Sequence, residues 1–151
     1  MAKNKYDKYF ISKPKLRYNL SGHNPDTKIE GMTPAQVFLD KDLVPGCPFW
    51  FDVVWIYDKV APAPWVFAHK HDVDEVLVFL ATNGEHDLGG EVELGMGEEG
   101  EIHTIRQTTA VYIPAGVTHC PLTIKKVDKK KPFFFLAFLL QPEYKSSISK
   151  S

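Results

Sequence analysis

The chain has 151 residues, 44% of them hydrophobic, and its 18 Lys+Arg nearly cancel its 19 Asp+Glu. That length suits one domain able to bury a core without disulfide bonds, and the net charge of -1 gives no reason to expect nucleic acid or an anionic membrane as a partner. An aromatic content of 13%, with 10 Gly and 11 Pro, favours a turn-rich β protein over a helical bundle.

Residues 1–45 show no clear periodicity and are predicted to form an N-terminal arm of short extended and helical pieces. Within this arm, residues 33–40 (TPAQVFLD) open with Thr and Pro, both helix-start signals, and predict one helical turn. The charged start lacks the apolar stretch of a secretory signal, and the longest apolar run, residues 133–140, is too short to cross a bilayer. These features predict a cytoplasmic protein that does not enter a membrane.

Residues 46–141 differ in character and are predicted to form a β-barrel. Residues 49–60 (FWFDVVWIYDKV) are rich in β-branched and aromatic side chains, which is typical of a strand. Similar segments recur at roughly 8–12-residue spacing between turn signals, as in a sandwich or closed barrel. We predict strands within 65–71, 74–82, 91–97, 100–107, 109–116, 118–127 and 132–140, a hairpin around 95–100, and a polar, frayed tail over 142–151.

Three histidines and a glutamate are the candidate metal ligands. His69 and His71 lie two apart, so on a strand they point to the same face. Glu75 and His119, arriving from other strands, could close the set around one cation, with the turn at Gly116 bringing the strand of His119 close. Three imidazoles and a carboxylate suit divalent Fe, Mn, Ni, Co, Cu or Zn, and leave coordination positions open.

Two neighbouring carboxylates compete with Glu75 for the ligand role. Asp72 and Asp74 lie in the same stretch. A strand that turns Glu75 inward would turn Asp74 outward, so we prefer Glu75.

Residues 69–75 (HKHDVDE) and 114–119 (PAGVTH) resemble the two motifs of the cupin superfamily, H-x-H followed by Glu and P-x-G-x-x-H. The resemblance covers about residues 64–121, and the strand pattern extends it to 46–141. It implies an all-β, antiparallel jelly-roll barrel behind the N-terminal arm. It also implies that four side chains hold a single metal: His69, His71, Glu75 and His119.

Three further residues are candidates for catalysis: His103, Arg106 and Tyr112. His103 would act as an acid or base if its strand face lines the barrel, and the alternative is an exposed strand histidine. Arg106 points to the opposite face, where it either clamps a substrate carboxylate or meets solvent. Tyr112 is a candidate for the pocket wall, together with Trp55, Tyr57, Phe67 and Phe79.

The two cysteines, Cys47 and Cys120, lack the spacing of a metal-binding pair. Because Cys120 directly follows His119, we expect its side chain on the opposite strand face, as a buried structural thiol and not a nucleophile. His23 and His86 lie in loop-like sequence and receive no role.

Two functions follow from the resemblance. The first is a mononuclear metal-dependent enzyme acting on a small organic molecule, with dioxygenation, decarboxylation, elimination and isomerisation all open. The aromatic-rich lumen favours oxygenase-type chemistry with Fe or Mn, whereas Ni, Zn, Co and Cu remain possible. The alternative is a small-molecule binding or sensing protein without catalysis. The arm and the apolar segment 133–140 also predict a homodimer, because an apolar strand edge needs a cover.

Overall fold

The computed structural model describes residues 4–17, 20–24, 29–84 and 86–148, and these are almost entirely antiparallel β structure. They form a short 3-10 helix, η1 (Asp7–Tyr9), followed by the strands β1 (Lys15–Arg17), β2 (Glu30–Met32), β3 (Ala35–Leu39), β4 (Trp50–Ala61), β5 (His69–Lys70), β6 (Glu75–Ala81), β7 (Asp87–Met96), β8 (Glu101–Gln107), β9 (Thr109–Ile113), β10 (His119–Val127), β11 (Phe133–Leu139) and β12 (Ser147–Ile148).

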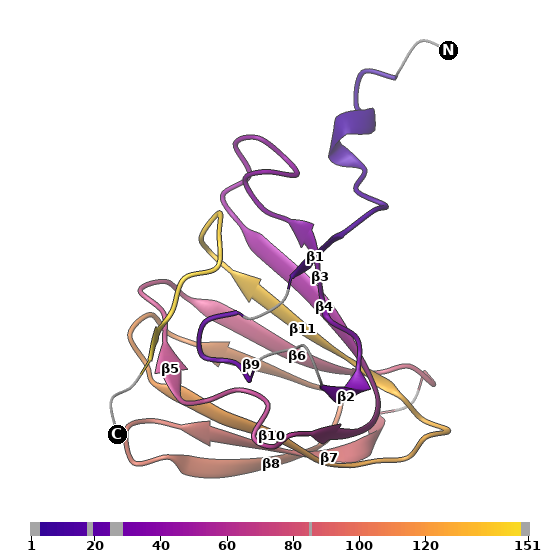
Figure 1. Ribbon diagram of the computed structural model, residues 1–151, viewed down its shortest axis with the longest axis vertical. Coiled ribbons are helices and arrows are strands. Elements are labelled where there is room, and N and C mark those ends of the chain that lie inside the picture. Colours follow the sequence, from indigo (N-terminus) through magenta and orange to yellow (C-terminus); the bar gives the residue numbers. More distant parts are fainter. Residues whose placement is uncertain (1–3, 18–19, 25–28, 85, 149–151) are drawn as a thin grey trace.

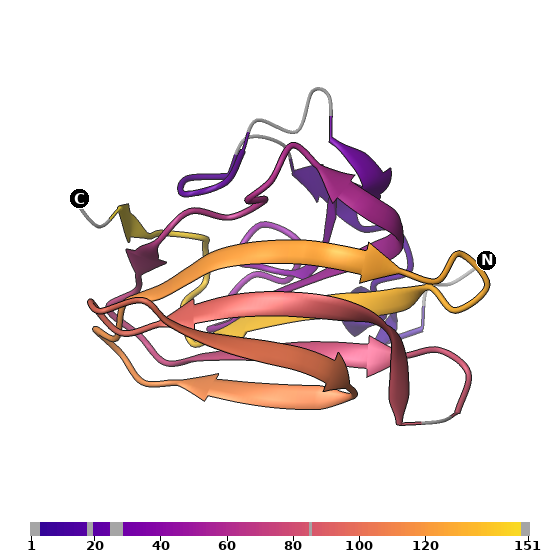
Figure 2. The same cartoon turned by 90° about the horizontal axis from the view of Figure 1, so that it is seen from below.

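The strands build two sheets that face each other as an antiparallel jelly roll (Figures 1 and 2). The seven-stranded sheet has the order β1-β3-β4-β11-β6-β9, with β2 also paired to β4. The five-stranded sheet has the order β12-β5-β10-β7-β8. Seen from below in Figure 2, β10, β7 and β8 lie in front of the larger sheet. The core fills the space between the two sheets.

Period-two alternation explains the long strands. In β4, Trp50, Val54 and Ile56 are buried, whereas Phe51 and Trp55 on the other face are not. The strand β11 repeats this pattern, with every second residue buried from Phe133 to Leu139. Each strand therefore places one apolar face in the core. The hairpin of β7 with β8 and most strands predicted from the sequence are confirmed. Within 65–71, however, only His69–Lys70 form a strand, and β7 begins at Asp87, before the predicted start at residue 91.

The predicted helical turn over residues 33–40 is wrong, because the chain forms β3 there. Ala35 and Val37 are buried while Gln36 between them is only partly so, which is a strand alternation. Pairing with β1 and β4 on either side satisfies the backbone. The Thr33 hydroxyl, expected to cap a helix, instead accepts the backbone N–H of Trp55 and so joins the residues just before β3 to β4.

The rest of the predicted arm divides into two parts. Residues 15–17, 30–32 and 35–39 add β1, β2 and β3 to the seven-stranded sheet. By contrast, η1 has no buried residue and projects beyond the sheets (Figure 1). No helix among the described residues is long and apolar enough to cross a membrane.

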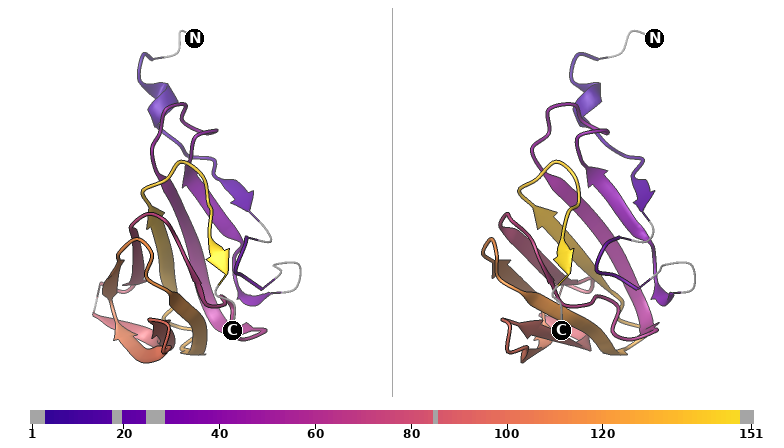
Figure 3. Two further views of the ribbon diagram at one scale, coloured as in Figure 1. Left: turned by 90° about the vertical axis from the view of Figure 1, so that its left-hand side faces the viewer. Right: turned by 60° about the vertical axis from the view of Figure 1, so that its left-hand side comes forward.

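The apolar segment that suggested an uncovered edge lies inside a sheet. The strand β11 pairs with β4 on one side and β6 on the other along its whole length. The edge argument for a homodimer is therefore wrong, and the homodimer itself stays a prediction. The tail predicted to be frayed returns to the barrel, where β12 pairs with β5 (Figure 3), and residues 149–151 lie outside the described ranges.

Candidate metal centre

Both sheets contribute to a cluster of four buried side chains. His69 begins β5 and His119 begins β10, and the two are direct partners across the five-stranded sheet. His71 follows β5, and Glu75 begins β6 in the other sheet. The ring centroids lie 4.4 Å apart for His69 and His119, 4.9 Å for His69 and His71, and 5.4 Å for His71 and His119.

The backbone fixes the orientation of all three imidazoles. Each Nδ1 lies within hydrogen-bond distance of a carbonyl oxygen: 2.8 Å from Phe67 for His69, 2.5 Å from Lys145 for His71, and 3.1 Å from Val117 for His119. A carbonyl only accepts, so each Nδ1 carries the proton and each Nε2 presents a lone pair. The partner on the other ring nitrogen is what orients a metal-ligating histidine.

The nitrogen lone pairs meet the carboxylate in the barrel interior. Glu75 Oε2 lies 2.9 Å from His119 Nε2 and 3.6 Å from His71 Nε2. These three atoms are buried and have no hydrogen-bond partner in the described part of the protein. Unpartnered buried polar atoms are costly and rare, and they lie within 4.8 Å of one another. Their chemistry and spacing fit a divalent cation.

Burial favours the neutral form of His69 and His71. Desolvation lowers the pKa of His69 to about 3, with the neighbouring His119 adding to the effect. Desolvation also lowers the pKa of His71, although the carboxylate of Glu75 opposes this. At neutral pH both rings can offer a lone pair without first losing a proton.

The cluster opens onto a small cavity between the sheets. Its volume is about 30 Å³, enough for about one or two water molecules. Apolar side chains such as Val54, Leu77 and Phe135 form much of the wall beside His69, Glu75 and His119. The structure therefore brings together the four residues predicted as ligands, at the edge of a small cavity with largely apolar walls.

Asp52 is a cavity residue that the sequence analysis missed. It lies on the inner face of β4, and Trp50 Nε1 donates to its Oδ2 at 2.8 Å. Burial raises the pKa of this carboxyl to about 7, and the negative charge of Glu75 adds to the increase. Its position in the strand was a usable signal, because Asp52 lies two residues from both Trp50 and Val54 and therefore shares their inward face.

His23 and Tyr144 also line the cavity and come from irregular segments. The Tyr144 hydroxyl lies 3.4 Å from His69 Nε2, and its ring packs edge-on against His71 at 5.3 Å. His23 lies 5.7 Å from the Tyr144 ring, and burial lowers the pKa of His23 to about 4. Nothing periodic in the sequence pointed to either residue.

Strand alternation predicted that Cys120 faces away from His119, and this prediction is wrong. The register of β10 against β7 shifts between His119 and Leu122, and Cys120 adopts a positive φ of 69°. This β-bulge interrupts the alternation, so Cys120 is buried and lines the same cavity as His119.

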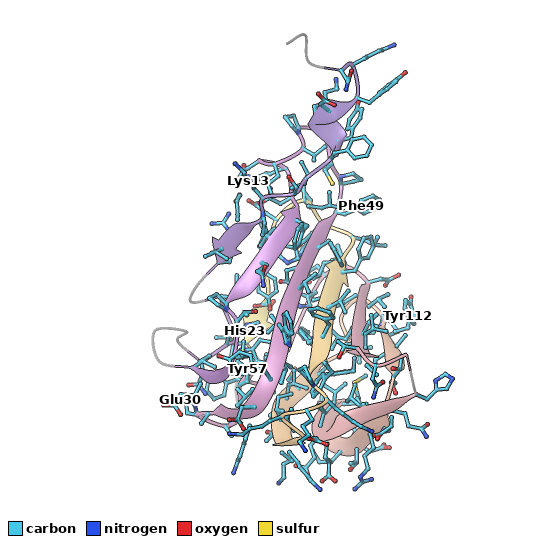
Figure 4. The ribbon with its side chains drawn as sticks, turned by 90° about the vertical axis from the view of Figure 1, so that its right-hand side faces the viewer. Lys13, His23, Glu30, Phe49, Tyr57 and Tyr112 are labelled. Carbon is cyan, nitrogen blue, oxygen red and sulfur yellow. The ribbon has the colours of Figure 1, made fainter. Side chains whose placement is uncertain are left out.

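The three catalytic candidates are exposed and lie outside this cavity. His103 sits 3.1 Å from Glu101, and the Arg106 guanidinium pairs with Glu91 at 2.9 Å. These two line a separate hollow of about 640 Å³ beside β8. The Tyr112 hydroxyl donates to Asp74 at 2.9 Å, and Asp74 is one of the two carboxylates that competed with Glu75 for the ligand role. Figure 4 shows Tyr112 well apart from the cavity residue His23. Of the predicted wall aromatics, Phe79 is buried in the core, whereas Trp55, Tyr57, Phe67 and Tyr112 are exposed.

No protein-family model and no curated protein matches the sequence. Solved structures do match the fold. A polyketide cyclase from Streptomyces resistomycificus is 13% identical, with a TM-score of 0.54 over 100% of this chain and 87% of the other. A predicted oxalate decarboxylase from Thermotoga maritima is 16% identical, with a TM-score of 0.54 over 85% of this chain and 92% of the other. A cupin-2 domain protein from Rhodospirillum rubrum is 13% identical, with a TM-score of 0.51 over 91% and 83%. The chain has the cupin fold.

Proposed function

Starting from the cupin fold, we propose that the protein is a mononuclear metal-dependent enzyme that acts on a small organic molecule. One observation carries this proposal: buried ligand atoms of His71, Glu75 and His119 converge without partners, and His69 stands beside them. Fe or Mn is favoured, because imidazole and carboxylate donors suit both metals. Nickel, zinc, cobalt and copper also fit the same donors, so metal analysis has to separate them.

The chain's own residues supply the rest of the chemistry. When bound, the metal would provide Lewis acidity and, with Fe or Mn, access to dioxygen chemistry. Backbone carbonyls hold the three rings in place, which preorganises the site. Asp52, with its pKa near 7, can hold or release a proton inside the cavity at neutral pH. The Tyr144 hydroxyl can donate a hydrogen bond to a substrate oxygen.

The cavity limits the substrate. A volume of about 30 Å³ leaves room for only a few heavy atoms unless the surrounding segments move. The apolar walls favour a partly apolar molecule and exclude water, which suits oxygenase-type chemistry. Decarboxylase, lyase and isomerase reactions remain alternatives to be separated by product analysis.

The same enclosure favours a second candidate function. A tight, mostly apolar cavity can also capture a small molecule without converting it, as a binding or sensing protein would. Turnover separates the two functions. A sensor would gain thermal stability on ligand binding and form no product.

The test uses protein loaded with Fe(II) or Mn(II) and a panel of small carboxylic acids, enols and phenols, with oxygen consumption and product formation as readouts. We expect turnover with at least one member. Glu75→Gln, which keeps the side-chain shape, is expected to reduce the activity by about 10–100-fold or more. Glu101→Gln is the matched control, because Glu101 is exposed on β8. A metal-loaded protein that binds ligands and forms no product would favour the sensor.

A further inference from the structure

The β-bulge in β10 turns a cysteine toward the metal centre. Met96 of β7 pairs with His119 and Leu94 with Leu122, so two residues of β10 face Gly95 alone. A side chain at Gly95 would come within 2.8 Å of the Cys120 carbonyl, and the close backbone approach therefore requires glycine. Non-glycine residues rarely adopt a positive φ, and such positions often mark functional sites.

Cys120 has two histidines as neighbours in the cavity. One ligand atom each from His69, His119 and Cys120 lies within 4.8 Å of the others, and all three residues are buried. His119 Nε2 has no hydrogen-bond partner among the described residues. The Tyr144 hydroxyl lies 3.4 Å from His69 Nε2, and Tyr144 lines the same cavity as these three residues.

We propose that His69, His119 and Cys120 form a second ligand set that takes a thiophilic cation such as Zn(II) or Cu(I). A thiolate with two imidazoles favours such soft or borderline ions, whereas His71, Glu75 and His119 present the nitrogen and oxygen donors that suit Fe and Mn. The thiol proton passes to solvent when the cation binds. His119 belongs to both sets, so one cation excludes the other.

This inference goes beyond the proposed function, because it requires no catalysis and no contribution from Glu75. It also gives the barrel a means of metal discrimination. A thiophilic ion held by Cys120 would occupy His119 and so prevent Fe or Mn from completing its own set. Zinc would therefore inhibit the proposed enzyme by competition for His119 and for His69, which stands beside the set of His71, Glu75 and His119.

Co(II) and Zn(II) are the probes for a test under reducing, anaerobic conditions. We expect the Co(II) protein to show a near-ultraviolet thiolate-to-metal charge-transfer band, which Cys120→Ala abolishes. We also expect Cys120→Ala to weaken Zn(II) binding by at least about tenfold. Mutating a residue that only hydrogen-bonds to a metal ligand already lowers metal affinity by about that factor. Cys47→Ala removes the chain's other cysteine and should change neither result. Mn(II) affinity should remain unchanged in Cys120→Ala, which reports that the variant is folded.

Each outcome is decisive. A Co(II)-loaded wild type without the band, or a Zn(II) affinity unchanged in Cys120→Ala, overturns the second ligand set. If Glu75→Gln loses Mn(II) binding and keeps the Co(II) band, the two sets are distinct. A wild type that shows the band and binds neither Mn(II) nor Fe(II) contradicts the proposed function and leaves this inference standing. If Cys120→Ala does not fold, the band in wild type and in Cys47→Ala still decides.

Discussion

Three histidines held by backbone carbonyls differ from histidines that merely pack in a core. A core histidine satisfies both ring nitrogens, whereas His71 and His119 each leave Nε2 buried and unpartnered. Leaving such a group unpaired costs about 1–3 kcal/mol. That cost is difficult to explain for a purely structural cluster, and a bound cation would offset it.

The buried histidines predict a pH-dependent stability of the metal-free protein. Burial lowers the pKa of His69 to about 3 and of His23 to about 4, and it lowers the pKa of His71 as well. Below pH 6.5 the unfolded chain takes up protons that the folded chain does not, so His69 and His23 each lower the unfolding free energy by about 1.4 kcal/mol per pH unit. His71 acts in the same direction. Asp52 opposes them between pH 3.8 and about 7, because its raised pKa stabilises the fold as the pH falls. The histidines outnumber it, so urea denaturation should show lower stability at pH 5 than at pH 8.

Asp52→Asn is the control for this prediction. The amide cannot ionise, so the variant loses the opposing contribution. Its stability should be higher than that of the wild type above pH 7, and should fall more steeply between pH 6.5 and 4. A flat profile for the wild type, or identical slopes for the two proteins, would show that these groups titrate normally in the folded state.

Sequence reasoning found the residues whose position follows from regular spacing. His69, His71 and Glu75 could be placed because strand alternation and the resemblance to cupins agree. Cys120 was misplaced because a bulge reverses alternation locally and depends on the approach of β7. Tyr144 and His23 could not be placed, because irregular segments reach the cavity only through long-range contacts.

At the scale of elements, the C-terminal segment is part of the proposed metal site. Its residue Lys145 supplies the carbonyl that orients His71. The ion pair of Glu143 with Lys41 at 2.8 Å anchors the segment to the rest of the protein, and the Pro142 carbonyl accepts the Lys41 N–H. Within the segment, Glu143 also pairs with Lys145 at 2.7 Å. Figure 3 shows this segment crossing back over the barrel to β12.

Truncation after Gln141 tests this role. The variant loses the partner of His71 and the side chain of Tyr144, while the paired strands β4, β6, β10 and β11 remain. We expect Mn(II) affinity to fall by about 10–100-fold, with the circular dichroism of the sheets retained. Deleting residues 1–10 is the matched control, since η1 buries no residue. Equal affinities for the two truncated proteins would show that the segment only covers the site.

The N-terminal strands show why the secondary structure was predicted wrongly where pairing with a neighbouring strand determines it. Residues 33–40 carry a helix-start signal, but local propensity is weak compared with burial against a neighbouring strand. Val37 is fully buried in β3 opposite Asp52 of β4, a contact that only the folded sheet supplies. By contrast, β4 and β11 were predictable because each alternates over a long stretch.

At the scale of the molecule, the outer face of the seven-stranded sheet predicts self-association. Trp55, Tyr57 and Leu80 are 43%, 46% and 40% exposed on this face, and Phe134 packs beside Trp55 at 5.4 Å. Contiguous exposed apolar surface marks interaction sites. We expect a homodimer through this face.

Sedimentation at micromolar concentration measures the oligomeric state. Trp55→Glu should shift the protein to a monomer, because it places a charge within the apolar surface. Ile102→Glu is the control, since Ile102 is also exposed, at 54%, and lies on β8 of the other sheet. A strictly monomeric wild type would contradict the prediction.

Metal content tests the central claim most directly. Elemental analysis would compare wild type purified without added metal or chelator with His119→Ala and His103→Ala, the latter an exposed histidine on β8. We predict near-stoichiometric divalent metal, Fe or Mn foremost, in the wild type and in His103→Ala. We predict its loss in His119→Ala, because that residue belongs to both ligand sets. A wild type that holds no metal even after reloading, or a His119→Ala variant that holds as much as the wild type, would contradict the account.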